Sequence, residues 1–205
     1  MCIRDRHKVG AMDQITKDKI ERIKEKLTEA LDILGLDIND PSIQDTPKRI
    51  AKMWVKEIFS GLFEPKPAMT TFEAPSDQMV TEIGITVRST CEHHFQPIYG
   101  RAHVAYLPNK KVLGLSKLNR AVDYFARMPQ IQEGLTKDIY EFLKQTLDTE
   151  DIAVVIDAEH FCVKMRGIKD DNSYTRTTML GGKFKSDSVV REEFFQAIPR
   201  VKFHG

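Results

Sequence analysis

In residues 79–197 the spacing of apolar residues changes from that of β-strands to that of α-helices and back again. This order of elements strongly limits the possible fold. Apolar residues alternate with polar or small ones from Ile83 to Val87, which is the period of a β-strand. The elements expected after it are a strand at 99–107, helices at 116–126 and 130–147, extended segments at 152–157, 161–168 and 176–179, and a helix at 188–197. An order of strands, two helices and strands predicts an α+β fold with an antiparallel sheet.

A helical appendage is expected before this region. Apolar residues recur at helical spacing over 17–34, and Gly35 follows as a stop. Thr46 can cap a second helix that has Pro47 at its first position, whereas the prolines of 63–77 predict a loop. We therefore expect a flexible or non-native leader at 1–16, a helical region with its loop at 17–78, and the main domain at 79–200.

Composition limits the setting of the protein. The 31 basic and 30 acidic residues nearly cancel, so global charge supports neither a nucleic-acid partner nor a membrane surface. The three cysteines, Cys2, Cys91 and Cys162, cannot all pair, which favours a reducing compartment. The sequence has neither a segment long enough for a transmembrane helix nor the apolar core of a signal peptide. We expect a cytoplasmic protein.

Cys91 and His94 are separated by two residues in a turn after the first strand. Zinc accepts both thiolate and imidazole, and Cys162 is the other plausible thiol ligand. Three protein ligands would leave a coordination position for water, as in catalytic zinc sites. A lone Cys-x-x-His pair is nevertheless common without a metal, and so is a buried thiol.

Two further histidines accompany these ligands. His93 precedes His94, and His160 lies two residues before Cys162. If 152–166 is one extended strand, its alternate side chains share a face. The polar members of that face would be His160, Cys162, Lys164 and Arg166. A strand that only filled a core would not end in this way, so the neighbours favour a metal site.

Four segments, in order, carry a resemblance to a known family. They are Cys91–Glu92–His93–His94, GLSKLNR at 114–120, QIQE at 130–133 and HFCVKMRG at 160–167. Together they resemble the GTP cyclohydrolase I family, and the similarity runs from about Thr46 to Ala197. The resemblance implies a tunnelling fold, an antiparallel β-β-α-α-β-β sheet with helices on one face. It also implies conversion of GTP to 7,8-dihydroneopterin triphosphate and formate, the first step of folate and pterin biosynthesis.

The resemblance assigns the chemistry to five residues. Cys91, His94 and Cys162 would be zinc ligands, and zinc would lower the pKa of a bound water so that hydroxide attacks C8 of guanine. His93 and His160 would transfer protons, because an imidazole pKa near ~6.5 suits that task. His160 would be the donor toward the imidazole ring nitrogen of the substrate.

Substrate binding is likewise implied by the resemblance. Gln132 and Glu133 would read guanine, since a carboxylate can accept hydrogen bonds from its N1–H and exocyclic amine. By itself, an acidic residue in the first helical turn after Pro129 would instead be taken to complement a helix dipole. Ser116 is expected to cap a helix, and a helix N-terminus with flanking cations is an anion site. The residues expected to bind the triphosphate are Ser116, Lys117, Arg120, Arg166, Arg49 and Lys52.

One departure and two alternatives stay open. The family usually has arginine where this chain has Gly134, which puts in doubt a packing or intersubunit contact. Family members are homodecamers of two pentamers with sites shared between subunits, so self-association is expected. The alternatives are a tunnelling-fold relative with other chemistry, similar to the nitrile reductases, and a non-catalytic zinc-stabilised nucleotide-binding scaffold.

Overall fold

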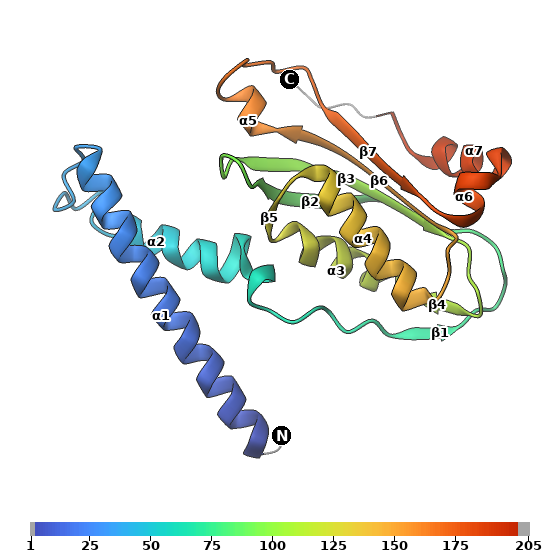
Figure 1. The fold of residues 1–205 in the computed structure, drawn as a ribbon, viewed down its shortest axis with the longest axis horizontal. Coiled ribbons are helices and arrows are strands. Elements are labelled where there is room, and N and C mark those ends of the chain that lie inside the picture. The colour runs from blue at the N-terminus through green and yellow to red at the C-terminus, as the bar shows by residue number, and fades with distance from the viewer. Residues whose placement is uncertain (1–2, 201–205) are drawn as a thin grey trace. The chain divides into compact units, whose positions relative to one another are not determined.

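The computed structural model describes residues 3–200 and divides the chain into two compact units, Met1–Phe63 and Glu64–Gly205 (Figure 1). The first unit is helical, and the second contains the sheet. Among the described residues, every helix is too short or too polar to cross a membrane.

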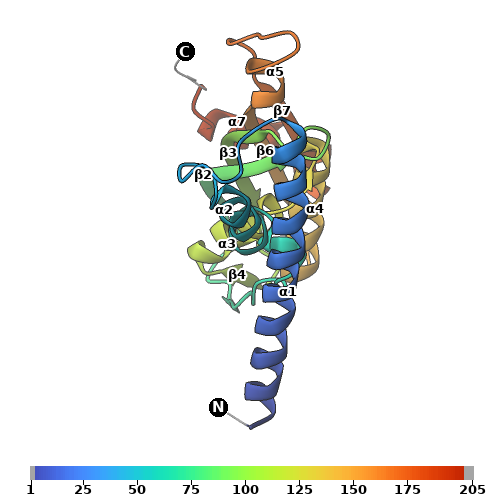
Figure 2. The same ribbon diagram turned by 90° about the vertical axis from the view of Figure 1, so that its left-hand side faces the viewer.

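The N-terminal unit is built on two packed helices. Helix α1 spans Ile3–Ile33 and α2 spans Thr46–Met53, and a π-helical turn, η1, continues α2 over Trp54–Ile58. A 3-10 turn, η2, follows at Ser60–Leu62. Their shared core contains Ile20, Ala51 and Val55, with Ile23 and Leu27 packed against it. The N-terminal part of α1 projects beyond α2 (Figure 2).

The start of α1 differs from the sequence-based expectation. A flexible or non-native leader is predicted at 1–16, whereas the helix begins at Ile3. Residues 1–2 lie outside the described part of the chain. Periodicity indicates a helix only where an apolar stripe faces a partner, so a helical extension without such a stripe gives no signal.

The second unit is organised around a five-stranded sheet in the order β5-β2-β3-β6-β7 (Figure 1). The strands are β2 (Val80–Cys91), β3 (Pro97–Tyr106), β5 (Pro129–Gln130), β6 (Ile152–His160) and β7 (Thr175–Leu180). All pairs are antiparallel except β2 with β5. The predicted α+β class and antiparallel sheet are confirmed.

Helices cover both faces of this sheet, at different places. Helices α3 (Leu115–Ala126) and α4 (Gln132–Leu147) share a core with Val154 of β6. Ala153 and Val155, which point to the other face, pack instead with Phe184 and Phe194 of α6 (Gly182–Ser186) and α7 (Ser188–Ala197). The α3–α4 layer agrees with the expectation of helices on one face, and the C-terminal helices add a second cover. The unbroken burial of residues 152–158 reflects this double cover.

Several short elements were not expected, and β1 and α5 are two of them. Strand β1 (Thr71–Glu73) lies within the predicted loop 63–77 and pairs with β4 (Lys111–Leu113). The expected extended segment at 161–168 is instead opened by a single helical turn, α5 (Phe161–Lys164). Pairing with a distant segment leaves little trace in local periodicity, which explains the missed strand.

Candidate metal centre and active site

The turn between β2 and β3 brings Cys91 and His94 together. The Phe95 N–H donates to the Cys91 carbonyl at 2.9 Å, and the Cys91 N–H donates to the Gln96 carbonyl at 2.9 Å. Phe95 closes the turn in the left-handed region, with φ of 52°. That conformation is uncommon outside glycine and is often found at functional sites. The turn therefore folds back so that His94 approaches Cys91 at the end of β2.

The second half of the candidate centre comes from the end of β6. His160 pairs with Ile98 of β3 and is the last residue of β6. The chain then enters α5, which carries Cys162. The expectation that His160 and Cys162 alternate along one strand face is thus wrong, because the strand stops at His160. The helical turn still directs Cys162 to the same end of the sheet.

Cys91, His94 and Cys162 form a cluster whose candidate ligand atoms all lie within 4.8 Å of one another. Tetrahedral zinc with bonds of about 2.0–2.3 Å requires ligand atoms about 3.4–3.8 Å apart, so only small shifts would be needed. Burial raises the pKa of the Cys162 thiol, and the neighbouring Cys91 raises it further. A bound cation would favour the thiolates instead. The donor set fits a metal, because it offers two thiols and one imidazole close together.

The start of α4 lies beside this cluster. Strand β5 pairs with the end of β2 through Cys91 and Gln130, which places Gln132 nearby. The Gln132 side chain is buried, and its Oε1 lies 2.7 Å from His160 Nε2. Burial lowers the pKa of His160, whereas the charge of Glu133 raises it. Glu133 itself is exposed.

Two other predicted residues surround the cluster. His93 is exposed, and its Nδ1 lies 3.9 Å from Cys91 Sγ. Arg166 donates from Nη1 to His94 Nε2 at 2.9 Å. Lys164, which lies two residues before Arg166 in the sequence, forms an ion pair with Glu159 instead. The structure therefore brings the predicted ligands, the two histidines predicted to transfer protons and one cation predicted to bind phosphate to one end of the sheet.

The other residues of this unit that are predicted to bind the triphosphate lie on α3, away from the cluster. Ser116, Lys117 and Arg120 are in the first turns of α3. The N-cap of α3 is Gly114, so the expectation that Ser116 caps this helix is wrong. Lys117 Nζ donates to the Ala68 carbonyl at 3.2 Å.

The position of α3 along the sheet is fixed by Asn119. Its Nδ2 donates to Glu82 Oε1 at 3.2 Å, near the start of β2. Cys91 is the last residue of the same strand. Glu82 and Cys91 are nine positions apart along the strand, which corresponds to roughly 30 Å at a rise of about 3.3 Å per residue. Within one chain, the α3 residues predicted to bind phosphate and the predicted metal ligands are therefore at opposite ends of the sheet.

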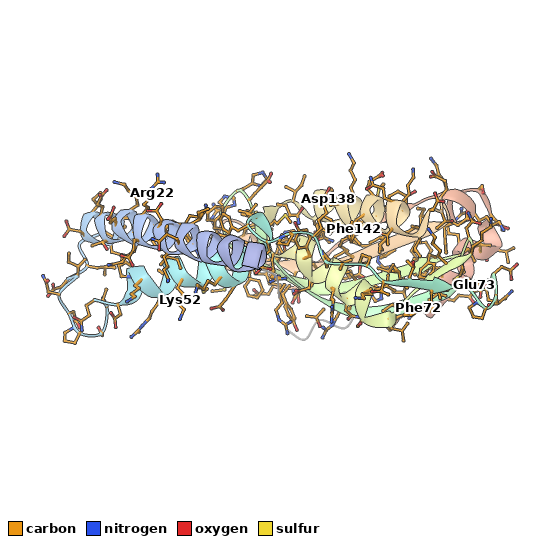
Figure 3. The ribbon with its side chains drawn as sticks, turned by 90° about the horizontal axis from the view of Figure 1, so that it is seen from below. Arg22, Lys52, Phe72, Glu73, Asp138 and Phe142 are labelled. Atoms are coloured by element: carbon orange, nitrogen blue, oxygen red, sulfur yellow. The ribbon has the colours of Figure 1, made fainter. Side chains whose placement is uncertain are left out.

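Arg49 and Lys52 belong to α2 of the N-terminal unit. Both are exposed, and Arg49 Nη2 lies 3.6 Å from Asp45 Oδ2. Lys52 projects from the helix into solvent (Figure 3). Their predicted role in binding triphosphate stays a prediction.

One buried polar group was not predicted from the sequence. Asp157 is 0% exposed and faces His103, which is 2% exposed, with Nε2 and Oδ2 3.7 Å apart. Burial lowers the pKa of His103. The available signal was a single carboxylate within the apolar run IAVVIDA at 152–158. A charge buried in such a strand requires a partner, and Arg176 provides it.

The chain is similar to known proteins over most of its length. The family model described as GTP cyclohydrolase I matches residues 23–199. A GTP cyclohydrolase 1 from Flavobacterium johnsoniae is 52% identical over 185 residues, covering 89% of this chain and 83% of that protein. One from Yersinia enterocolitica is 53% identical over 180 residues, covering 86% and 82%. One from Serratia proteamaculans is 50% identical over 190 residues, covering 91% and 85%. The chain belongs to the GTP cyclohydrolase I family.

Proposed function

We propose that this protein is a zinc-dependent hydrolase that converts GTP to 7,8-dihydroneopterin triphosphate and formate, the first step of folate and pterin biosynthesis. The observation that carries the proposal is the convergence of Cys91, His94 and Cys162 within 4.8 Å, beside His160, in a chain of this family. The two thiols also support a reducing, cytoplasmic location, since oxidation would destroy the ligand set.

The metal and the histidines have separate tasks in this proposal. Cys91, His94 and Cys162 would hold zinc, which when bound supplies a hydroxide at neutral pH for attack on C8 of guanine. His160 is partly buried next to the cluster and would pass protons to and from the opening ring. His93 is more exposed, with its Nδ1 3.9 Å from Cys91 Sγ, which suits exchange with solvent. A purely structural metal site would not need either histidine.

Guanine recognition falls to the start of α4. Glu133 is exposed within the first turn of the helix, adjacent to the buried Gln132. Its carboxylate can accept two hydrogen bonds from the N1–H and amine edge of guanine, which adenine does not offer. Adjacency to His160 supports this placement, because the charge of Glu133 acts on the pKa of that histidine.

The separation between the metal cluster and α3 supports a site shared between copies of the chain. Arg166 lies at the cluster, but Ser116, Lys117 and Arg120 are at the far end of the sheet. One chain therefore cannot apply both groups to a single triphosphate. We propose that α3 of a second copy completes each site, as expected for a closed ring within a decamer of two pentamers.

Zinc quantification combined with GTP turnover tests the proposed function. Zinc-loaded protein should release formate from GTP and form a fluorescent neopterin after oxidation and dephosphorylation of the product. Absence of GTP turnover by zinc-loaded, folded protein would refute the proposal. Activity of another kind in metal-free protein would indicate chemistry similar to the nitrile reductases. Unfolding on chelation, with no turnover on zinc restoration, would indicate a zinc-stabilised scaffold.

A further inference from the structure

We infer that Gln132 is a positioning residue that keeps the proton of neutral His160 on Nε2, so that Nδ1 is the atom through which His160 exchanges protons with the substrate. This inference rests on the proposed function and gives Gln132 a role other than reading guanine. It follows from the orientation of one buried amide.

The backbone fixes which way the Gln132 amide points. Its Nε2 lies 2.9 Å from the Ile156 carbonyl and 3.0 Å from the Thr175 carbonyl. Both are acceptors only, so the amide atom facing them must be the NH₂ group. Exchanging the two amide ends would set an oxygen against two carbonyls and leave a buried donor facing His160. The carbonyl oxygen of Gln132 therefore faces His160.

The tautomer of His160 follows from this orientation. Gln132 Oε1 can only accept a hydrogen bond, and it lies 2.7 Å from His160 Nε2. Nε2 must therefore carry a hydrogen. A neutral imidazole has one donor and one acceptor nitrogen, so Nδ1 holds the lone pair. A proton taken up at Nδ1 gives imidazolium, and the same proton leaves from Nδ1 while the Nε2–H bond to Gln132 remains.

The amide is held too firmly to turn toward a substrate. Gln132 is 1% exposed, and its Nε2 also lies 3.0 Å from Thr177 Oγ1. Thr136 Oγ1 bonds to that same hydroxyl at 2.6 Å and donates to the main-chain carbonyl of Gln132 at 2.8 Å. Rotation of the amide would turn its oxygen toward the Ile156 and Thr175 carbonyls and lose both hydrogen bonds, at about 0.5–1.5 kcal/mol for each bond.

The network also ties together two strands behind the site. Ile156 of β6 is paired with Thr177 of β7, and Gln132 contacts both residues from the α4 face. Its side-chain donors are thereby engaged with the sheet, whereas the adjacent Glu133 is exposed. A structure in which Gln132 reads guanine through its side chain would have to break these bonds. Holding His160 requires no rearrangement.

Two variants separate a positioning role from a structural one. Gln132→Met has a similar length but cannot accept from His160, and kcat should fall about 10–100-fold with KM for GTP nearly unchanged. Thr177→Val removes another partner of the same amide but keeps the contact with His160, so kcat should stay close to that of the unmodified enzyme. Zinc content and circular dichroism should match in all three proteins. An increase of KM with unchanged kcat in Gln132→Met, or an equal loss of kcat in Thr177→Val, would overturn the inference.

Nitrogen-15 NMR of histidine-labelled, zinc-loaded protein provides a readout that needs no turnover. Above the pH at which imidazoles titrate, His160 should show a protonated Nε2 and an unprotonated Nδ1, with its signals assigned by their loss in His160→Ala. A His160 protonated on Nδ1 would refute the inference even if Gln132→Met fails to fold. This spectrum is independent of GTP hydrolysis, so failure of the proposed function would be recognised separately.

Discussion

Arg176 donates two hydrogen bonds to Asp157, from Nε to Oδ1 at 2.7 Å and from Nη2 to Oδ2 at 2.8 Å. The carboxylate is 0% exposed and the arginine side chain is 39% exposed. The two residues are partners in the pairing of β6 with β7. A bidentate pair of this kind is stronger than two neutral hydrogen bonds and geometrically selective. It links the outermost described strand of the sheet to its interior.

Asp157→Asn should destabilise the protein by about 2 kcal/mol. The amide can accept at one position only and turns a donor toward the guanidinium, so one buried hydrogen bond is lost. Urea unfolding followed by circular dichroism measures the change. Asp138→Asn, an exposed change on α4 (Figure 3), should shift the free energy of unfolding by less than about 0.5 kcal/mol. Equal effects of the two substitutions would contradict the prediction.

The free energy of unfolding should decrease as the pH falls below about 6.5, in part because of His103. Burial is the largest influence on its pKa and lowers it, with Asp157 acting in the opposite direction and Arg176 in the same direction. Its Nδ1 accepts from the Gly84 N–H at 3.2 Å. Below about pH 6.5 the unfolded chain binds a proton that the folded chain does not, and this favours unfolding.

His103→Gln is the matched variant for this pH dependence. It removes the titrating group, so the decrease in stability between about pH 7 and pH 5 should become shallower. Urea unfolding at a series of pH values gives the slope for each protein. An unchanged slope in His103→Gln would show that other groups cause the dependence.

Cys162→Ser should lower zinc affinity by at least about 100-fold and abolish GTP turnover, because it removes one of three protein ligands. Metal analysis after dialysis against a weak chelator measures the loss. His160→Ala is the control, since it should retain zinc and fold normally while turnover falls about 10²–10⁴-fold. Normal zinc content in Cys162→Ser would exclude the cysteine as a ligand.

Mixing two inactive variants should restore activity if sites are shared between copies. Arg120→Ala removes a phosphate cation near one end of the sheet, and Cys162→Ser removes a metal ligand at the other. Co-expressed chains should assemble about a quarter of their sites from two intact halves. Turnover by the purified mixture, compared with each variant alone, measures the rescue. A mixture as inactive as its components would place both residues in the same half of the site.

Gly134→Ala should stabilise the protein by about 0.5–1 kcal/mol, because glycine in a helix loses more conformational freedom on folding than alanine. A Cβ at this position would lie 3.6 Å from Ile131 Cγ1 and 3.7 Å from Gln130 Oε1, which are ordinary contacts. Thermal unfolding provides the measurement. Gly100→Ala is the opposite control, since its Cβ would lie 2.0 Å from the Asp157 carbonyl oxygen. Destabilisation by Gly134→Ala would contradict the prediction that a Cβ is accommodated at this position.

Local signals predicted local elements well. Helix α7 has the expected bounds, Ser188–Ala197, and its cap is local, with Asp187 accepting from the Val189 N–H. The short strand expected at 176–179 lies within β7. In contrast, β1 depends on pairing with β4, and α5 interrupts a segment whose alternation suggested a strand. Tertiary contacts decide such segments, and one-dimensional periodicity does not contain them.

The sequence predicts which residues form the candidate site better than it predicts their arrangement. Cys91 and His94 are close in sequence, and a turn after a strand was expected to bring them together. Cys162 joins them through a helical turn that the sequence did not indicate. The buried bonds of Gln132 were not predictable, because they involve carbonyls of two strands that follow it in the chain. The sequence therefore predicts which side chains come together at the site, but it does not predict their hydrogen-bond partners.

The hydrogen bond from Asn119 to Glu82 has a consequence for stoichiometry under the proposed sharing of sites. Each chain then supplies the α3 residues of one site and the metal ligands of another. The number of complete sites therefore equals the number of contacts between neighbouring chains. An open row of chains always leaves one half unused at each end, whereas a closed ring uses every half. Dilution that opens a ring would therefore lower activity before any chain unfolds, and separation into single chains would abolish it.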